Sequence, residues 1–304
     1  MSFSSGGQFE GGRVRQRGAG VKVGGGVGLG GLLIVGLAYL FGGNQLGSLV
    51  SGIVGGGGGN TGPQVIAGSE GYIGGCSAEQ ANTDRNCRLS ATVQSLDAYW
   101  GATLPQQANI AYTLPEVVSF SNSTSTACGT ASAASGPFYC PGDQTIYIDV
   151  SFYDLLSSQY GASGGALAEE YVVAHEMGHH IENELGILNK AANDEGASSD
   201  SVKVELMADC YAGLWAGQAA TTVDPKTGVT FLDPITPTQL KDALSAAAAV
   251  GDDHIQQQAG YINPESFTHG TSQQRVAWFS RGYSSGQLSA CDTFAAPTLD
   301  IAGP

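Results

Sequence analysis

Apolar residues recur at steps of three and four positions along residues 167–181. Those in step are Leu167, Tyr171, Ala174, Met177 and Ile181. This spacing is the period of an amphipathic helix that turns one face towards a core. No proline interrupts the segment, and Gly186 follows it as a helix stop. We therefore expect one helix here.

Two further helices are expected from their starting residues. Residues 201–215, "SVKVELMADCYAGLW", begin with the cap-type residues from Ser199 to Ser201. In "ITPTQLKDALSAAAAVGDD", Thr236 and Gln239 form a capping-box pattern at the start of an alanine-rich run.

The first helix carries the chain's densest group of histidines. Three of the five histidines lie in "AHEMGHHIENELG", where His175, Glu176 and His179 form the pattern HExxH. Residues four positions apart share one helix face, about 6 Å apart along the axis, so His175 and His179 can bind one metal ion. Glu176 is placed to reach a water on that metal. His180 is rotated by about 100° from His179 and is expected to have a structural role.

A third ligand is expected on the second helix, because catalytic zinc takes three protein ligands and leaves a fourth position open. Glu205 and Asp209 lie four positions apart, hence on one face. We predict that Glu205 is the third ligand of one zinc ion per chain. Asp209 would accept a hydrogen bond from a ligand histidine. The alternative is that both acids lie on a solvated helix face.

The order of these motifs resembles a known plan. HExxH followed by a glutamate on a second helix is similar to the gluzincin arrangement of thermolysin. More closely, the chain resembles the bacterial membrane-anchored neutral zinc metallopeptidases. The similar segments are "EGGR", "GPFYCPGDQTIYIDVSFYDLL", "YVVAHEMGHHIE", "VELMADCYAGLWA", "VGDDHIQ", "FTHGTSQQRVAWFSRG" and "CDTF". The resemblance covers nearly the whole chain, except for residues 71–110, and implies an α+β, zincin-like domain.

The resemblance also implies an activity, the hydrolysis of bonds in a peptide or protein substrate. Zinc would activate a water, and Glu176 would act as its general base. Two alternatives stay open. One is a zinc-stabilised binding or scaffold domain with little turnover, and the other is a zinc amidohydrolase that acts on a non-peptide amide. An intact Glu176 and an open fourth position favour an enzyme over a scaffold.

A substrate-binding strand is a further expectation. In "QTIYIDV", residues 144–150, apolar Ile146, Ile148 and Val150 alternate with Tyr147 and Asp149, which predicts a half-buried strand. Gluzincins use a sheet-edge strand beside the active-site helix to pair with extended substrate, and the resemblance implies the same role here. The alternative is an ordinary strand that does not contact substrate.

His269 is the candidate donor to the carbonyl oxygen of the substrate. Gluzincins place such a donor beside the zinc, and His269 precedes Gly270 at the expected N-terminus of a helix. Arg275, further into that helix, is expected to orient His269 or to bind a substrate carboxylate. The alternative for His269 is that it caps or packs the loop. His254 is expected at the surface.

The N-terminal region predicts a membrane anchor. Residues 1–22 are a basic tail, residues 23–42 carry no charge and are long enough as a helix to span a hydrocarbon core, and residues 43–70 are a glycine-rich linker. Residues 71–304 would form the zinc metallopeptidase domain. The basic tail predicts a cytoplasmic N-terminus, a single pass through the cell membrane and an extracytoplasmic domain. A flexible glycine-rich segment is the alternative, and a cleaved signal peptide is less favoured because no typical cleavage site follows.

Charge and cysteine content add two expectations. Four basic residues against one acidic residue give residues 1–42 a net charge of +3, and the remainder, with 8 basic and 26 acidic residues, carries −18. This acidic balance argues against nucleic acid as a partner.

The six cysteines all follow the expected anchor, which suits disulfides in an oxidising compartment. Of 15 connectivities, short separation favours Cys76–Cys87 and Cys128–Cys140, and Cys210–Cys291 then remains.

Overall fold

The computed structural model describes residues 2–17, 70–121, 123–132 and 135–303. The expected anchor over residues 23–42 lies outside these residues, as does the expected linker except for its last residue. Among the residues that the structure does describe, no helix combines the length and the apolarity needed to cross a membrane.

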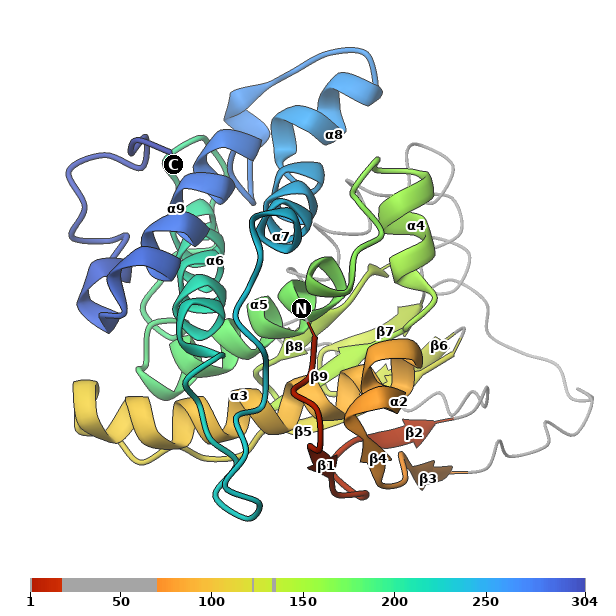
Figure 1. The fold of residues 1–304 in the computed structure, drawn as a ribbon. Helices are drawn as coiled ribbons and strands as arrows, with labels where there is room; N and C mark the ends of the chain where they lie inside the picture. Colours follow the sequence, from red (N-terminus) through yellow and green to blue (C-terminus); the bar gives the residue numbers. More distant parts are fainter. Residues whose placement is uncertain (1, 18–69, 122, 133–134, 304) are drawn as a thin grey trace, which may run out of the picture.

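A five-stranded sheet lies beside a group of long helices (Figure 1). Its strands, in order across the sheet, are β3 (Glu70–Tyr72), β2 (Arg15–Arg17), β5 (Glu116–Phe120), β9 (Thr145–Ile148) and β8 (Phe138–Cys140). Strands β2, β5 and β9 are parallel, whereas β3 and β8 are antiparallel to their neighbours. The expectation of an α+β domain is therefore confirmed.

Strand β9 differs from the expected half-buried edge strand. All four of its residues are buried, and it lies between β5 and β8. Tyr147, on the face that the alternation predicts to be exposed, stacks on Phe138 with ring centroids 5.1 Å apart. A small core that also includes Cys128 and Ala131 covers this face. The edge next to the helix that carries HExxH is therefore β8, and the expected edge position of residues 144–150 is wrong.

Residues 2–17 belong to the folded domain. Strand β2 pairs with β3 and β5, so it lies inside the sheet, and Phe3, Phe9 and Val14 are buried in the main core. Arg13 forms an ion pair with Asp97 at 2.6 Å. The expectation that residues 1–22 form a cytoplasmic tail while the domain lies across the membrane conflicts with this sheet, because paired strands must lie on one side of a membrane.

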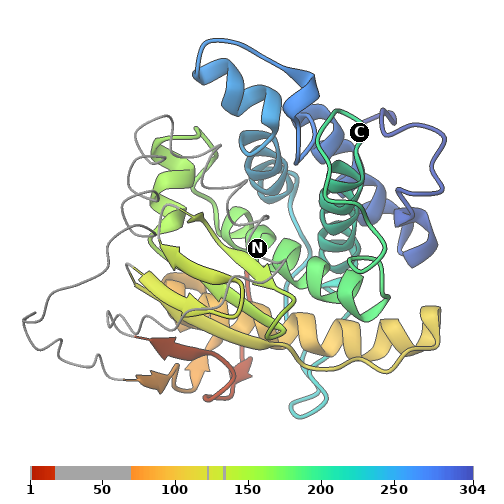
Figure 2. The ribbon, with the colours of Figure 1, turned by 180° about the vertical axis from the view of Figure 1, so that it is seen from behind.

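Three of the helices confirm the expectations. They are α5 (Ala166–Glu184), α6 (Asp200–Gln218) and α7 (Pro237–Ala249). The hydroxyl of Ser199 accepts from the backbone N–H of Val202 at the start of α6, and Thr236 and Gln239 form the capping box of α7. Helix α5 lies between the sheet and the helices α6 and α7 in both views (Figures 1 and 2).

The remaining elements complete the domain around these. The longer two are α3 (Arg85–Ala108) and α9 (Ser272–Ser285). The shorter ones are β1 (Gln8–Phe9), β4 (Cys76–Ser77), α2 (Ala78–Thr83), β6 (Ser123–Thr126), β7 (Gly129–Ser132), α4 (Phe152–Ser158), α8 (Asp252–Gln258), η2 (Pro264–Ser266) and η3 (Leu288–Cys291).

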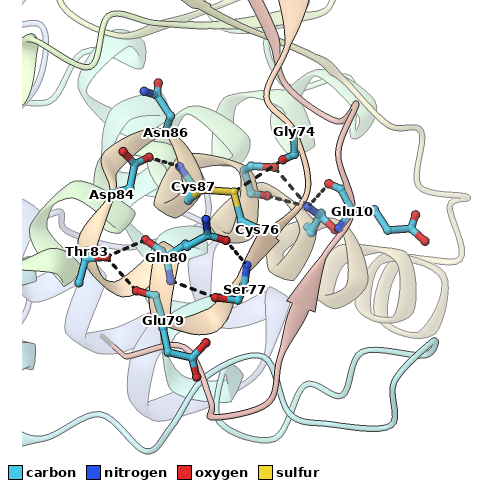
Figure 3. The surroundings of a disulfide bond; sticks show 12 residues. Glu10, Gly74, Cys76, Ser77, Glu79, Gln80, Thr83, Asp84, Asn86 and Cys87 are labelled. Carbon is cyan, nitrogen blue, oxygen red and sulfur yellow. Dashed lines mark hydrogen bonds between the residues drawn. A yellow bond between two sulfur atoms is a disulfide. The ribbon is translucent and has the colours of Figure 1, made fainter.

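All three predicted disulfides are present. Cys76 pairs with Cys87, Cys128 with Cys140, and Cys210 with Cys291. Figure 3 shows how the first of them joins β4 to α3, next to the capping bonds that begin α2 and α3. The last of them links α6, which carries Glu205, to the C-terminal segment.

Candidate metal centre

The two histidines and the glutamate that the sequence predicts as ligands meet between α5 and α6. One ring nitrogen each from His175 and His179 and one carboxylate oxygen of Glu205 all lie within 4.8 Å of one another. Nε2 of His175 is 3.1 Å from Oε2 of Glu205, and Nε2 of His179 is 3.6 Å from Oε1. Three such donor atoms around one point are what a catalytic zinc site requires of the protein.

A glycine within HExxH allows the two helices to come together. A Cβ atom on Gly178 would lie 2.9 Å from Cα of Ala208 on α6, closer than packed atoms tolerate. Gly178 therefore permits the approach that brings Glu205 and Asp209 up to the histidines.

A carboxylate contacts Nδ1 of each predicted ligand histidine, on the side of the ring opposite to Glu205. Oδ1 of Asp209 is 2.9 Å from Nδ1 of His175, and Oε2 of Glu182 is 2.8 Å from Nδ1 of His179. These bonds leave Nε2 of both rings facing Glu205. Asp209 lies where the sequence predicts it, whereas the role of Glu182 was not predicted. The three-residue spacing of His179 and Glu182 on one helix was the available signal.

Arg275 and Tyr171 hold Asp209 in turn. Arg275 donates to Oδ2 of Asp209 from Nε at 2.8 Å and to Oδ1 from Nη2 at 3.0 Å. The hydroxyl of Tyr171 donates to Oδ1 of Asp209 at 2.5 Å. The sequence predicts Tyr171 only as an apolar residue of the helix, not as a partner of Asp209. The buried guanidinium of Arg275 therefore supports Asp209 behind His175, and no hydrogen bond joins it to His269.

The centre contains more buried negative than buried positive charge. Four carboxylates that are each at most 8% exposed surround the ligands, those of Glu176, Glu182, Glu205 and Asp209. In the part of the chain that the structure describes, Arg275 pairs with two of these carboxylates, those of Glu205 and Asp209. Burial would lower the pKa of His175, but Asp209 and Glu205 outweigh it and raise this pKa to about 10. A cluster that attracts protons this strongly also attracts a divalent cation, and its donor atoms are those that zinc prefers. The residues present therefore fit zinc.

Glu176 lies beside the ligands without being one of the three. Glu176 and the three predicted ligands line one cleft, and Glu176 is 7% exposed. Burial raises the pKa of its carboxyl, and the charges of His175 and His179 partly offset this effect. A carboxylate with an increased affinity for protons, facing the ligand site, is suited to general-base chemistry.

His269 reaches the same cleft from the loop before α9. Asp252, at the start of α8, fixes this loop. Its Oδ2 accepts from the backbone N–H groups of Thr268, His269 and Gly270 at 2.8, 2.7 and 2.9 Å, and its Oδ1 lies 3.2 Å from Nδ1 of His269. Burial would lower the pKa of His269, but Glu205 and Asp252 raise it. The contact with Asp252 therefore fixes the orientation of the ring. No local sequence pattern marks Asp252, so its role was not predicted.

The walls of the cleft are mostly apolar. The wall residues outside the ligand cluster include Phe138, Phe152, Val172, Leu188, Val204 and Val250. Tyr139 and Phe138 come from the edge strand β8, which contacts α5. The cleft therefore lies between a sheet edge and the metal-binding helix.

The other two histidines lie apart from the ligand cluster. Nε2 of His180 is 2.7 Å from the carbonyl oxygen of Thr113, and its Nδ1 is 3.1 Å from the hydroxyl of Tyr139. His180 thus ties α5 to β8, in agreement with a structural role. Half-buried His254 places Nε2 3.1 Å from the carbonyl oxygen of Tyr160.

Comparison with known proteins gives a family match over nearly the whole chain. The model of the family described as "Putative neutral zinc metallopeptidase" matches residues 2–294. This range includes the three ligands, Glu176 and His269.

Curated relatives match with substantial identity. The uncharacterized protein Rv2575 of Mycobacterium tuberculosis is 50% identical over 221 residues, which is 72% of this chain and 74% of that protein. The uncharacterized protein Mb2605 of Mycobacterium bovis matches to the same extent. The uncharacterized protein YpfJ of Escherichia coli K12 is 40% identical over 221 residues, 70% of this chain and 73% of that protein. No solved structure matches the chain.

Proposed function

The chain belongs to the neutral zinc metallopeptidase family, and from this premise we propose that it hydrolyses peptide bonds at the centre formed by His175, His179 and Glu205. The observation that carries the proposal is the convergence of these three ligands with Glu176 in one cleft. A scaffold would need the ligands but would have no use for a buried carboxylate facing them.

Zinc held by the three ligands would supply Lewis acidity, which lowers the pKa of a water and polarises a carbonyl group. Glu176 takes a proton from the attacking water and passes it to the leaving amine. Asp209 and Glu182 keep the two imidazoles in one orientation during this cycle. Arg275 neutralises Asp209 and keeps it from moving.

His269 donates a hydrogen bond to the carbonyl oxygen of the substrate as that oxygen gains negative charge. Asp252 holds the imidazole in place before substrate arrives, so the donor requires little reorganisation. The carboxylate of Asp252 favours the protonated ring.

The His269→Ala variant is expected to retain zinc and to lose about 10²–10³-fold in kcat. KM should change much less, because the lost hydrogen bond forms mainly in the transition state. Steady-state kinetics with one peptide substrate measure both constants. His254→Ala is the matched control, since His254 contacts Tyr160 and should leave kcat unchanged. An unchanged kcat in the His269→Ala variant would exclude His269 from the mechanism.

Strand β8 is the proposed docking edge for substrate. It ends the sheet in the described part of the chain, and its residues Phe138 and Tyr139 line the cleft. An extended peptide that pairs with this edge would pass in front of the ligands, as in other cases of strand addition. The apolar walls then favour apolar side chains next to the scissile bond.

Metal removal tests the proposed activity against a scaffold role. The purified chain, incubated with a mixed peptide library, should generate cleavage products, and a zinc chelator should abolish them. Added zinc should restore them. A chain that binds zinc but leaves every peptide intact would instead support a scaffold, or an amidohydrolase if a non-peptide amide is turned over.

The proposed location of the domain is outside the cytoplasm. Three disulfides support it, because such bonds persist in oxidising compartments. Residues 2–17 would lie on the same side, since they share the sheet. Protease added to intact spheroplasts should degrade the domain, and cysteine-directed alkylation without reductant should label no thiol. A protected domain with reactive thiols would place it in the cytoplasm.

A further inference from the structure

Glu182 is a buried carboxylate for which the proposed reaction has no direct use. It lies on α5, three residues after His179, and is 0% exposed. Oε2 accepts from Nδ1 of His179 at 2.8 Å. Within the described part of the chain, Oε1 has no hydrogen-bond partner, although it is buried. A buried charge with an unpaired oxygen is unfavourable unless another charge compensates it.

The other ligand histidine has a carboxylate partner with a different electrostatic setting. Asp209 accepts from Nδ1 of His175, but Arg275 neutralises it through two hydrogen bonds. Glu182 forms no ion pair with a lysine or arginine among the described residues, and its ion-pair partner there is His179. A positive charge that compensates Glu182 must therefore lie on His179 itself or beyond its ring, where His175, His179 and Glu205 converge.

We infer that Glu182 is a positioning residue that sets how tightly the centre binds zinc. Its oxygen fixes the ring of His179 with Nε2 towards Glu205, and its charge would be compensated by a dication that His175, His179 and Glu205 hold. Helix geometry suffices for this role, because residues three apart are neighbours on one helix face. The inference rests on the metal site of the proposed function and not on peptidase activity.

Two substitutions separate the geometry from the charge. Glu182→Gln keeps an oxygen that can accept from Nδ1 of His179 but removes the charge, whereas Glu182→Ala removes both. Competition with a chromophoric chelator gives the dissociation constant for zinc alone. Thermal unfolding of the full chain, with and without zinc, gives the stabilisation that zinc binding provides.

We expect zinc binding to weaken about 10-fold in Glu182→Gln and by about 10–100-fold in Glu182→Ala. The unfolding temperature of the metal-free Gln variant should stay close to that of the wild type, while its rise on adding zinc shrinks. A purely structural residue would give the reverse, with a less stable metal-free chain and unchanged zinc affinity. The control is Glu265→Gln, which changes an exposed glutamate and should match the wild type in both measurements.

If Glu182→Ala fails to fold, the zinc affinity of Glu182→Gln still tests the inference. Zinc dissociation constants of the Gln variant within about twofold of the wild-type value would overturn the inference, provided that Glu205→Ala abolishes binding. A wild-type chain that binds no zinc would refute the metal site itself, and the inference would fall with it.

Discussion

The Glu176→Gln variant is expected to lower peptide turnover by about 10²–10⁴-fold while zinc stays bound. Glutamine has nearly the shape of glutamate but cannot accept a proton from water. The three ligands, which lie on other positions of α5 and on α6, are untouched. Zinc content by atomic absorption and initial rates on one peptide measure the two effects separately.

The matched control for this variant is Glu265→Gln, because it makes the same chemical change at an exposed position. Its rate and its zinc content should equal those of the wild type. Hydrolysis by the Glu176→Gln variant near the wild-type rate would contradict the assigned role of general base. Loss of zinc from that variant would instead make Glu176 a ligand.

The Glu205→Ala variant is expected to lose zinc. Glu205 is the sole ligand from α6, and its removal leaves two histidines, too few for a stable site. The loss of zinc affinity should exceed the roughly 10–100-fold loss that follows substitution of a residue that hydrogen-bonds a ligand. The measurement is the dissociation constant by chelator competition, together with peptide turnover, which should vanish.

Glu205→Ala also changes a buried charge, so its folding must be checked. Circular dichroism of the metal-free variant should resemble that of the metal-free wild type. Glu265→Ala is the control for the substitution itself. If a folded Glu205→Ala chain binds zinc with wild-type affinity, the third ligand lies elsewhere.

Local patterns made part of this structure predictable from the sequence. The apolar period around HExxH predicts α5, and the four-residue spacing of its histidines already places two ligands on one face. Cap residues predict the start of α6 and α7. Short separations favour two disulfides, and elimination leaves Cys210–Cys291. Apart from Cys210–Cys291, whose residues are 81 positions apart, each of these features depends on residues that are close in the chain.

Features that depend on distant contacts were missed or misread. Strand β2 is short and polar, "RQR", and only its pairing with β3 and β5 brings it into the sheet. The inner position of β9 depends on β8 and on the small core that covers Tyr147. Asp252 acts through a loop that follows it by 16 to 18 positions. The pairing of Arg275 with Asp209 rather than with His269 could not be predicted, because Asp209 lies on another helix.

The most direct test of the central claim is to count new N-termini in a peptide library. Zinc-loaded wild-type chain and zinc-loaded Glu176→Gln chain are incubated with the same library, and mass spectrometry identifies the products. We predict new peptide N-termini with the wild type, at bonds flanked by apolar residues, and almost none with the variant. Equal product from both chains, or none from either when both carry zinc, would contradict the claim that this centre hydrolyses peptide bonds.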